Sequence, residues 1–188
     1  MIDLSSHPAH LHRLDFKTPD PTNENSCFVS YYQYGRAAAI DDESSQGKTA
    51  LLNQLAVQFL SEPTFDQLRT KEQLGYVVFS QRRIIRDIQS AWFLIQSSVK
   101  DCLHIRNRLD IHLAKMRTKM ANLSDEEFAT VVSAVNTAIS EKDKNLSEEF
   151  LRVWNHALCT HTYIFDKQER DIALLATITK ADLQAFFE

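Results

Sequence analysis

Residues Ser61 to Ser80 read SEPTFDQLRTKEQLGYVVFS and place a helix, a charged turn, a lone glycine and an aromatic strand in succession. Phe65, Leu68 and Arg69 lie within one or two helical turns, so the two apolar side chains compete for the core while Arg69 projects outward. Gly75 permits a backbone turn that other residues disfavour, and Tyr76 then opens a strand. The stretch therefore predicts a helix that leads directly into a strand.

The same stretch carries the best candidate for a binding site. Arg69 and Tyr76 flank the turn, where a guanidinium and a phenol are able to hydrogen-bond one carbonyl or carboxylate oxygen. The alternative is an Arg69 that is paired to Glu72 and a Tyr76 that is half-buried at a sheet edge. The residues alone leave both interpretations open.

Upstream, the pattern indicates a strand, a connection and a helix. Ser26–Tyr34 is β-branched and aromatic, which predicts a strand, and the polar stretch Gly35–Gly47 connects it to the next element. Apolar residues at helical spacing predict a helix over Lys48–Leu60. Pro63 suits the first turn of a second helix, which Gly75 ends.

Residues 1–25 show little pattern, although a short alternation indicates a strand that ends before Pro19. The alternating residues are His10, His12, Leu14 and Phe16.

Downstream, two strand-like runs are followed by helical patterns. Tyr76–Ile85 and Ser90–Val99, joined by a polar turn around Arg86–Gln89, predict a hairpin. An apolar helical stripe follows, and three further helix starts are indicated. The stripe is Ile105, Leu109, Leu113, Met116 and Met120, and the starts are Ser124, Ser147 and Thr179. Strands early and helices late predict an α+β fold, with an antiparallel sheet packed against helices in a single domain over residues 1–188.

Composition argues against several classes of partner. The net charge of -4 gives no overall attraction to nucleic acid or to anionic membranes. No apolar run approaches the roughly 18 residues of a membrane helix, and the polar start Met1–His12 lacks the apolar core of a signal peptide. Cys27, Cys102 and Cys159 are widely spaced and odd in number, which favours reduced, partly buried thiols and an intracellular location, in the cytoplasm or an organelle.

The search for a metal site finds little. Neither H-E-x-x-H nor H-x-x-E-H occurs. The histidines at positions 7, 10 and 12 cluster in the N-terminal segment, where solvent exposure or adventitious metal binding is the simpler interpretation. His156 and Cys159 are one helical turn apart but have no evident third ligand. We therefore expect no metal in this chain.

Other catalytic motifs are equally weak. Gly47, Lys48 and Thr49 resemble the end of a phosphate-binding loop, but its earlier glycine is replaced by Asp42. No G-x-S-x-G occurs, and no cysteine has a nearby histidine and acid in an arrangement that the sequence alone could credit as a nucleophile, so none is predicted. Three arginines near the hairpin end indicate a solvated strand edge rather than a nucleic-acid contact. They are Arg82, Arg83 and Arg86.

The run Arg69-Thr70-Lys71-Glu72-Gln73-Leu74-Gly75-Tyr76 closely resembles the R-T-K-E-Q-L-G-Y signature of insulysins and nardilysins, pitrilysin-like metallopeptidases with an inverted zinc motif. A looser similarity extends from about Asn25 to Phe187. It includes Tyr31-Tyr32-Gln33, Ile95-Gln96-Ser97, Leu123-Ser124, Lys144-Asn145-Leu146-Ser147 and Leu175–Phe187.

The resemblance implies the metallopeptidase-homology fold of the LuxS/pitrilysin-like type and a place as the fourth of four homologous domains. Those domains form two bowl-shaped halves around a closed chamber, with zinc in the first domain. On that basis Arg69 and Tyr76 hydrogen-bond the peptide backbone near the scissile carbonyl, and Phe65 lines the adjoining subsite. This chain then has no catalytic residue and no cofactor of its own.

Two departures from the family pattern stand out. Relatives continue beyond Glu188 into a last strand and tail, and Gln81–Ile85 lacks the glycine-containing turn expected there.

The resemblance implies peptide substrates and the missing N-terminal domains as partners, with a homodimer also possible. The competing hypothesis is a pseudo-peptidase of the same fold, a binding or scaffold protein without a zinc site. A nucleic-acid role for the three arginines is a distant third.

Overall fold

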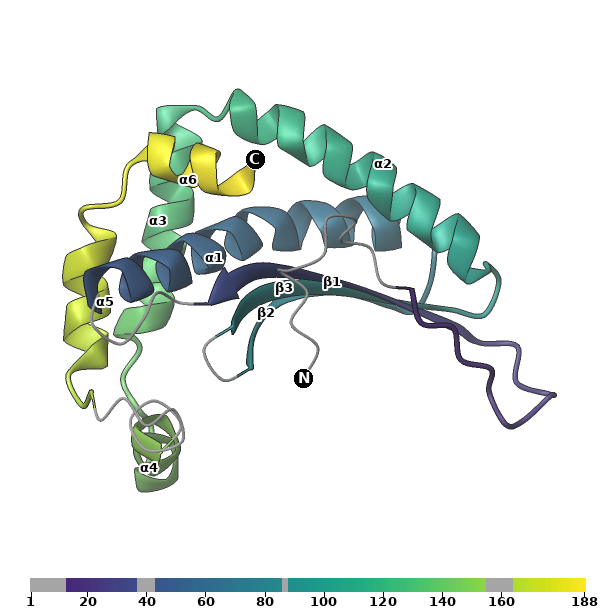
Figure 1. Cartoon of the computed structure of the whole chain (residues 1–188), viewed down its shortest axis with the longest axis horizontal. Helices are drawn as coiled ribbons and strands as arrows, with labels where there is room; N and C mark the ends of the chain where they lie inside the picture. Colours follow the sequence, from purple (N-terminus) through teal and green to yellow (C-terminus); the bar gives the residue numbers. More distant parts are fainter. Residues whose placement is uncertain (1–12, 37–42, 86–87, 155–163) are drawn as a thin grey trace.

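The computed structural model describes residues 13–36, 43–85, 88–154 and 164–188. Its sheet has the strand order β1-β3-β2 and is antiparallel throughout. Strand β1 is Ser26–Arg36, β2 is Val77–Ile85 and β3 is Ile88–Ser97. Figure 1 shows helices α1 and α2 lying over one face of this sheet. The predicted α+β class is confirmed.

The central strand β3 aligns apolar residues across the sheet. Ile95 pairs with Phe28 on one side and with Val78 on the other, and alternation points all three toward the helices. The predicted hairpin is confirmed, but its turn is shorter than expected. Ile85 pairs with Ile88, so Ile88 and Gln89 belong to β3 and extend its hydrogen-bonded ladder. Both side chains are buried. Residue 86 of the predicted turn lies outside the described residues.

The helix predicted over Lys48–Leu60 is present but longer, since α1 covers Glu43–Thr64 and contains Pro63. A π-helix, η2, follows at Phe65–Lys71 without an intervening turn. The prediction that Pro63 opens a separate helix is therefore wrong. Proline lacks the amide hydrogen for an i−4 bond, and here the winding changes from α to π just beyond it.

The strand suggested near the N-terminus is wrong where it can be assessed. Leu14 and Phe16 are exposed and form no strand, because none of the described strands pairs with them. His10 and His12 lie outside the described residues.

The remaining elements are helices, and their starts follow local capping rules. Helix α2 is Cys102–Ala121, α3 is Asp125–Ser140, α4 is Leu146–Val153, α5 is Lys167–Leu175 and α6 is Lys180–Phe187. Capping boxes at Ser124 and Thr179 confirm the predicted starts of α3 and α6. Helix α4 begins earlier than predicted, because Asn145 rather than Ser147 caps it by accepting from the Glu148 amide at 3.0 Å. Helix α5 was not predicted.

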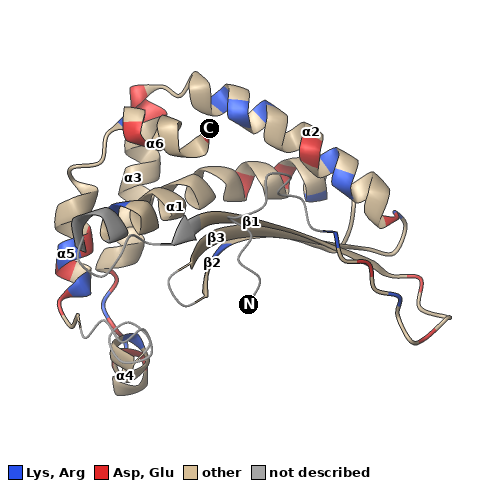
Figure 2. Cartoon of the chain, in the orientation of Figure 1, with Lys and Arg blue, Asp and Glu red and all other residues tan. Residues whose placement is uncertain are grey.

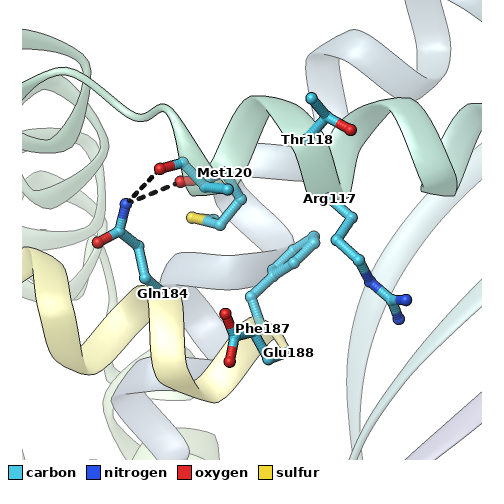
Figure 3. A pocket seen from close by; sticks show the side chains of 7 residues that line it. Arg117, Thr118, Met120, Gln184, Phe187 and Glu188 are labelled. Atoms are coloured by element: carbon cyan, nitrogen blue, oxygen red, sulfur yellow. Dashed lines mark hydrogen bonds between the residues drawn. The ribbon is translucent and has the colours of Figure 1, made fainter.

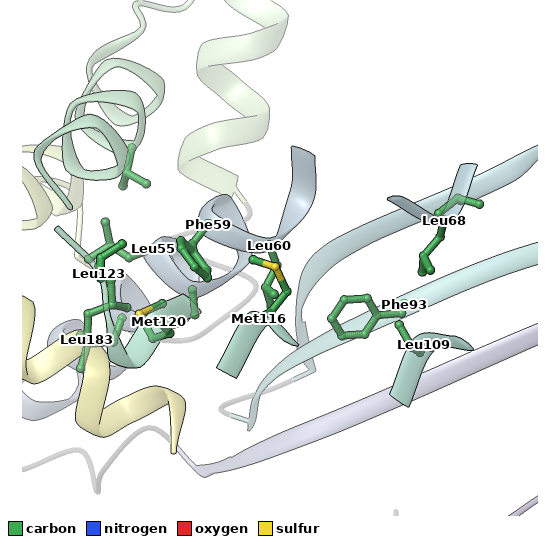
Figure 4. Packing of buried hydrophobic residues seen from close by; sticks show 14 of the residues in the cluster. Leu55, Phe59, Leu60, Leu68, Phe93, Leu109, Met116, Met120, Leu123 and Leu183 are labelled. Atoms are coloured by element: carbon green, nitrogen blue, oxygen red, sulfur yellow. The ribbon is translucent and has the colours of Figure 1, made fainter. Parts of the chain in front are cut away.

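The core lies between the sheet and its helical layer. The α1 residues Leu55 and Phe59 pack beside Met120 of α2 and Leu183 of α6, while Leu68 and Leu109 close the other end near Phe93, as Figure 4 shows. Leu68 is completely buried, so η2 is anchored to this core through its apolar side. The opposite side of η2 remains free to present polar groups.

Charged side chains are concentrated on the helical layer. Figure 2 shows Lys and Arg along α2, whereas β3 carries no charged residue. Among the described residues, no helix combines the length and apolar character needed to cross a membrane.

Candidate functional site

The site is built on η2, whose winding is visible in its side-chain pairs. Lys71 Nζ lies 2.6 Å from Asp66 Oδ2, and Gln67 Nε2 donates to Glu72 Oε1 at 2.7 Å. Both pairs are five residues apart, the spacing that π winding brings into register. Since π turns inside helices often occur at functional sites, this segment is where a binding group is to be sought.

A compact turn carries the chain from η2 into β2. The Leu74 amide donates to the Leu68 carbonyl at 3.0 Å, and Gln73 adopts a left-handed conformation with φ of 50°. Gly75 is required for another reason than predicted. A Cβ at this position would lie 1.8 Å from the Gln96 carbonyl oxygen, so glycine allows a close approach to β3, while Gln73 makes the unusual turn.

The turn brings the three predicted site residues together. The guanidinium carbon of Arg69 lies 5.2 Å from the ring centroid of Phe65 and 5.0 Å from that of Tyr76. Arg69 Nη1 also donates to the Tyr76 carbonyl oxygen. The two rings are exposed by 45% and 82% respectively. Arg69 is thus held between two aromatic faces that solvent, or a ligand, can reach.

Glu72 does not pair with Arg69. Its carboxylate binds Arg108 of α2 through two hydrogen bonds, Nε to Oε2 and Nη2 to Oε1, both 2.7 Å. The hydrogen bond from Arg108, and to a lesser degree that from Gln67, lowers the pKa of Glu72. The hydrogen bond to Glu72 in turn raises the pKa of Arg108. The alternative in which Arg69 pairs with Glu72 and Tyr76 is half-buried is therefore wrong.

A second polar contact secures the start of η2. His112 of α2 is buried, and its Nε2 lies 3.0 Å from Oγ1 of Thr64, the residue that precedes η2. Burial lowers the pKa of His112, so its ring is neutral at neutral pH. Helix α2 thus contacts the π-helical segment at its start and at its end.

The other groups singled out from the sequence have structural partners. Lys48 Nζ lies 2.8 Å from Asp182 Oδ1, an ion pair that joins α1 to α6. Arg82 donates to Gln54 Oε1 at 3.1 Å, and Arg83 stacks over Trp92. The third arginine of that group, residue 86, lies outside the described residues.

The cysteines and histidines that the structure describes form no metal site. Cys27 and Cys102 are free, as predicted, but exposed rather than partly buried; Cys27 is the second residue of β1 and Cys102 is the first of α2. The described residues contain no group of three His, Cys, Asp or Glu side chains placed to hold a metal ion, so zinc does not fit them. His7, His156 and Cys159 lie outside the described residues.

A pocket between the end of α2 and α6 is separate from the Arg69 site. It is lined by Arg117, Met120 and Phe187, among others, as Figure 3 shows. Gln184 points from α6 to the end of α2, where it donates to the carbonyl oxygens of Met120 and Ala121 at 3.0 and 3.1 Å. The Met120 carbonyl also accepts from the Leu123 amide at 3.1 Å, so Gln184 adds to the capping of the last turn of α2 and has a structural role.

Sequence reasoning missed Arg108 and His112. Their four-residue separation places both on one face of α2, but nothing in the local pattern indicates that this face meets η2. Gln96 was noticed only as part of a strand, since the close contact of its carbonyl with Gly75 depends on the register of β2 and β3.

The comparisons with known proteins concern the family and the fold. Residues 38–154 match the family model of the PQQ synthase PqqF-like C-terminal lobe, domain 4. The chain is 36% identical over 169 residues to the peroxisomal insulin-degrading enzyme-like 1 of Arabidopsis thaliana, covering 90% of this chain and 16% of that protein. Identity to the insulin-degrading enzyme of Homo sapiens is 34% over 165 residues, which cover 87% and 15% of the two chains.

A solved structure supports the fold. The crystal structure of pitrilysin matches with a TM-score of 0.73 at 22% sequence identity, over 88% of this chain and 17% of that one. The chain therefore spans about a sixth of the length of these relatives.

Proposed function

This chain belongs to the family of PqqF-like C-terminal lobe domains, and we propose that it is the substrate-binding domain of an insulysin-like zinc metalloendopeptidase. Its homology to the C-terminal domain of peptidases such as insulin-degrading enzyme supports this proposal. In this role the domain contacts short peptides and forms part of the chamber wall, while zinc and hydrolysis belong to other domains of a longer protein.

The observation that carries the proposal is the environment of Arg69. Among the described residues, its guanidinium pairs with no carboxylate and its one hydrogen-bond acceptor is the Tyr76 carbonyl. Arginine has five N–H donors in a planar fork, so donors remain for the oxygen of a bound peptide. The exposed Tyr76 adds a phenol beside them.

The chemical contribution of this pair is to orient the peptide and stabilise developing negative charge. Donors that are already in place when charge develops on a scissile carbonyl lower the barrier without reorganisation. Arg69 and Tyr76 donate to the substrate backbone, and Phe65, which stacks on Arg69, lines the neighbouring subsite. None of the three acts as a nucleophile or as a general base.

Turnover of insulin by the longer protein tests these roles. We expect Arg69→Ala and Tyr76→Phe each to lower kcat/KM by about 10- to 100-fold. Loss of a donor from an oxyanion hole costs about 100-fold or more, so this effect is smaller or, at most, equal to the low end of that range. Zinc content should not change. Arg106→Ala, at an exposed ion pair on α2, is the matched control and should retain wild-type turnover.

Two outcomes would decide against this assignment. Unchanged kcat/KM in both site variants would show that Arg69 and Tyr76 take no part in substrate binding. A longer protein without H-x-x-E-H would favour the pseudo-peptidase hypothesis, in which the same surface binds peptides without cleavage.

We also propose an intracellular location, in the cytoplasm or an organelle, to which the similarity to a peroxisomal enzyme lends support. The partners in this proposal are peptide substrates, the other domains of the longer protein and a second copy in a homodimer. Sedimentation of the purified protein measures the last of these directly.

A further inference from the structure

Arg69 and Glu72 are close in sequence, yet they do not neutralise each other. A positive and a negative side chain three residues apart in a helix usually attract. Here both Glu72 oxygens accept from other groups, Oε2 from Arg108 and Oε1 from Arg108 and Gln67, each at 2.7 Å. Two carboxylates lie three residues from Arg69, and both have other partners: Glu72 is fully engaged by Arg108 and Gln67, and Asp66 Oδ2 lies 2.6 Å from Lys71 Nζ.

The partner of Glu72 comes from a different part of the chain. Arg108 lies on α2, 36 residues further along, and its bidentate geometry fixes the direction of the carboxylate as well as its distance. The Glu72 side chain is only 14% exposed in this pair, so water does little to weaken it.

Helix α2 also holds the start of the same segment. Arg108 and His112 are one turn apart, and they contact Glu72 and Thr64, which flank η2. Because Leu68 is buried between these contacts, the segment that carries Arg69 is held at both ends and on its inner face.

We propose that Arg108 is a positioning residue, which keeps the Glu72 carboxylate on α2 and thereby leaves the Arg69 guanidinium available to a peptide. The proposal rests on the substrate-binding role of Arg69. Loss of Arg108 frees the Glu72 carboxylate, which then competes with the peptide oxygen for Arg69. Loss of Arg108 thus weakens peptide binding through the freed Glu72 carboxylate, and removal of both charges restores binding.

The side-chain NMR signal of Arg69 reports this directly in the 188-residue chain. Because the Arg69 guanidinium lies over the Phe65 and Tyr76 ring faces, we expect ring currents to shift the Arg69 Nε proton upfield. In Arg108→Met we expect most of that upfield shift to be lost. The dissociation constant for the probe acetyl-Ala-Ala-Phe-Ala-amide should rise about fivefold, the upper end for an exposed charge pair.

Four further variants make the test specific. Arg108→Met with Glu72→Gln should regain the wild-type signal and affinity, and Glu72→Gln alone should keep both. Arg108→Lys, which retains the charge, should keep most of the Arg69 upfield shift. It takes the place of Arg108→Met in the NMR measurement if Arg108→Met does not fold. Arg106→Met, at the neighbouring ion pair on α2, should have no effect.

An unchanged Arg69 signal in folded Arg108→Met, or a double variant no better than Arg108→Met, would overturn the proposal. If the wild-type chain does not bind the peptide, the substrate-binding function fails, but the Arg69 signal still decides the role of Arg108.

Discussion

Arg69 is oriented by aromatic faces and a backbone carbonyl rather than by a carboxylate. Contacts of a guanidinium with ring faces are worth about 0.5–1 kcal/mol at exposed sites, which holds the side chain without consuming its N–H donors. Because Phe65 precedes Arg69 by one turn and Tyr76 lies beyond the turn, the arrangement needs both the helix and the start of β2. The three residues therefore work as one unit.

Gly75 sets the distance between this unit and the sheet. In Gly75→Ala the new methyl group would meet the Gln96 backbone, and a backbone cannot move aside as a side chain can. We expect the free energy of unfolding to fall by about 1–3 kcal/mol, the usual cost of overpacking, as measured by urea denaturation.

Gly47→Ala is the matched control for this prediction. Among the described residues its Cβ would meet the end of the Leu174 side chain, at 2.7 Å, and that side chain is able to rotate. Equal losses in the two variants would show that the contact with Gln96 is not what requires glycine.

Segment η2 joins the site to the core through α2. Its inner side is fixed by the buried Leu68, and its ends are fixed by Thr64–His112 and Glu72–Arg108. A π-helix is rare and occurs mostly as a single turn inside an α-helix, and these side-chain contacts hold the segment in that conformation. Its stability should therefore depend on the charge state of Glu72.

This dependence predicts a pH effect. The Arg108 hydrogen bond lowers the pKa of Glu72 from its ordinary value of 4.5, so the ionised carboxylate favours the folded state. That contribution is fully present above about pH 4.5 and is lost as the pH falls through the lowered folded-state pKa.

Urea unfolding at neutral pH and below pH 4 measures the effect. Glu72→Gln should reduce stability at neutral pH, and the difference from wild type should shrink in acid. Glu149→Gln, an exposed carboxylate on α4, is the control. A difference for Glu72→Gln that does not change with pH would contradict the prediction.

The whole molecule is a sheet with a helical layer, and the Arg69 site lies where one end of the layer passes into the sheet. Lys48 and Asp182 join α1 to α6 at a different place. The pocket between α2 and α6 is separate from the Arg69 site, since Phe65, Arg69 and Tyr76 do not line it. The proposed binding chemistry therefore lies at the η2–β2 junction.

At this scale we predict that the chain folds without a metal. Purified protein should hold well under one zinc per chain by elemental analysis, and EDTA should leave the midpoint of thermal unfolding unchanged. Retention of stoichiometric zinc, or a lower midpoint with EDTA, would contradict the prediction and point to histidines outside the described residues.

Much of the fold was predictable because its signals are local. The capping boxes at Ser124 and Thr179 use side chains three residues apart, and strand β1 follows from its β-branched and aromatic residues. Pro63 misled the prediction, since its preference for a first turn competes with the continuous packing of α1 and η2 against the core.

The sequence by itself determined the α+β class, the hairpin and the candidacy of Phe65, Arg69 and Tyr76, because these depend on spacing along the chain. Only the tertiary structure decided that Glu72 pairs with Arg108 and that Gly75 meets Gln96. Both contacts join residues more than twenty positions apart, and their geometry is set by the packing of α2 and the register of β3. Local patterns contain neither.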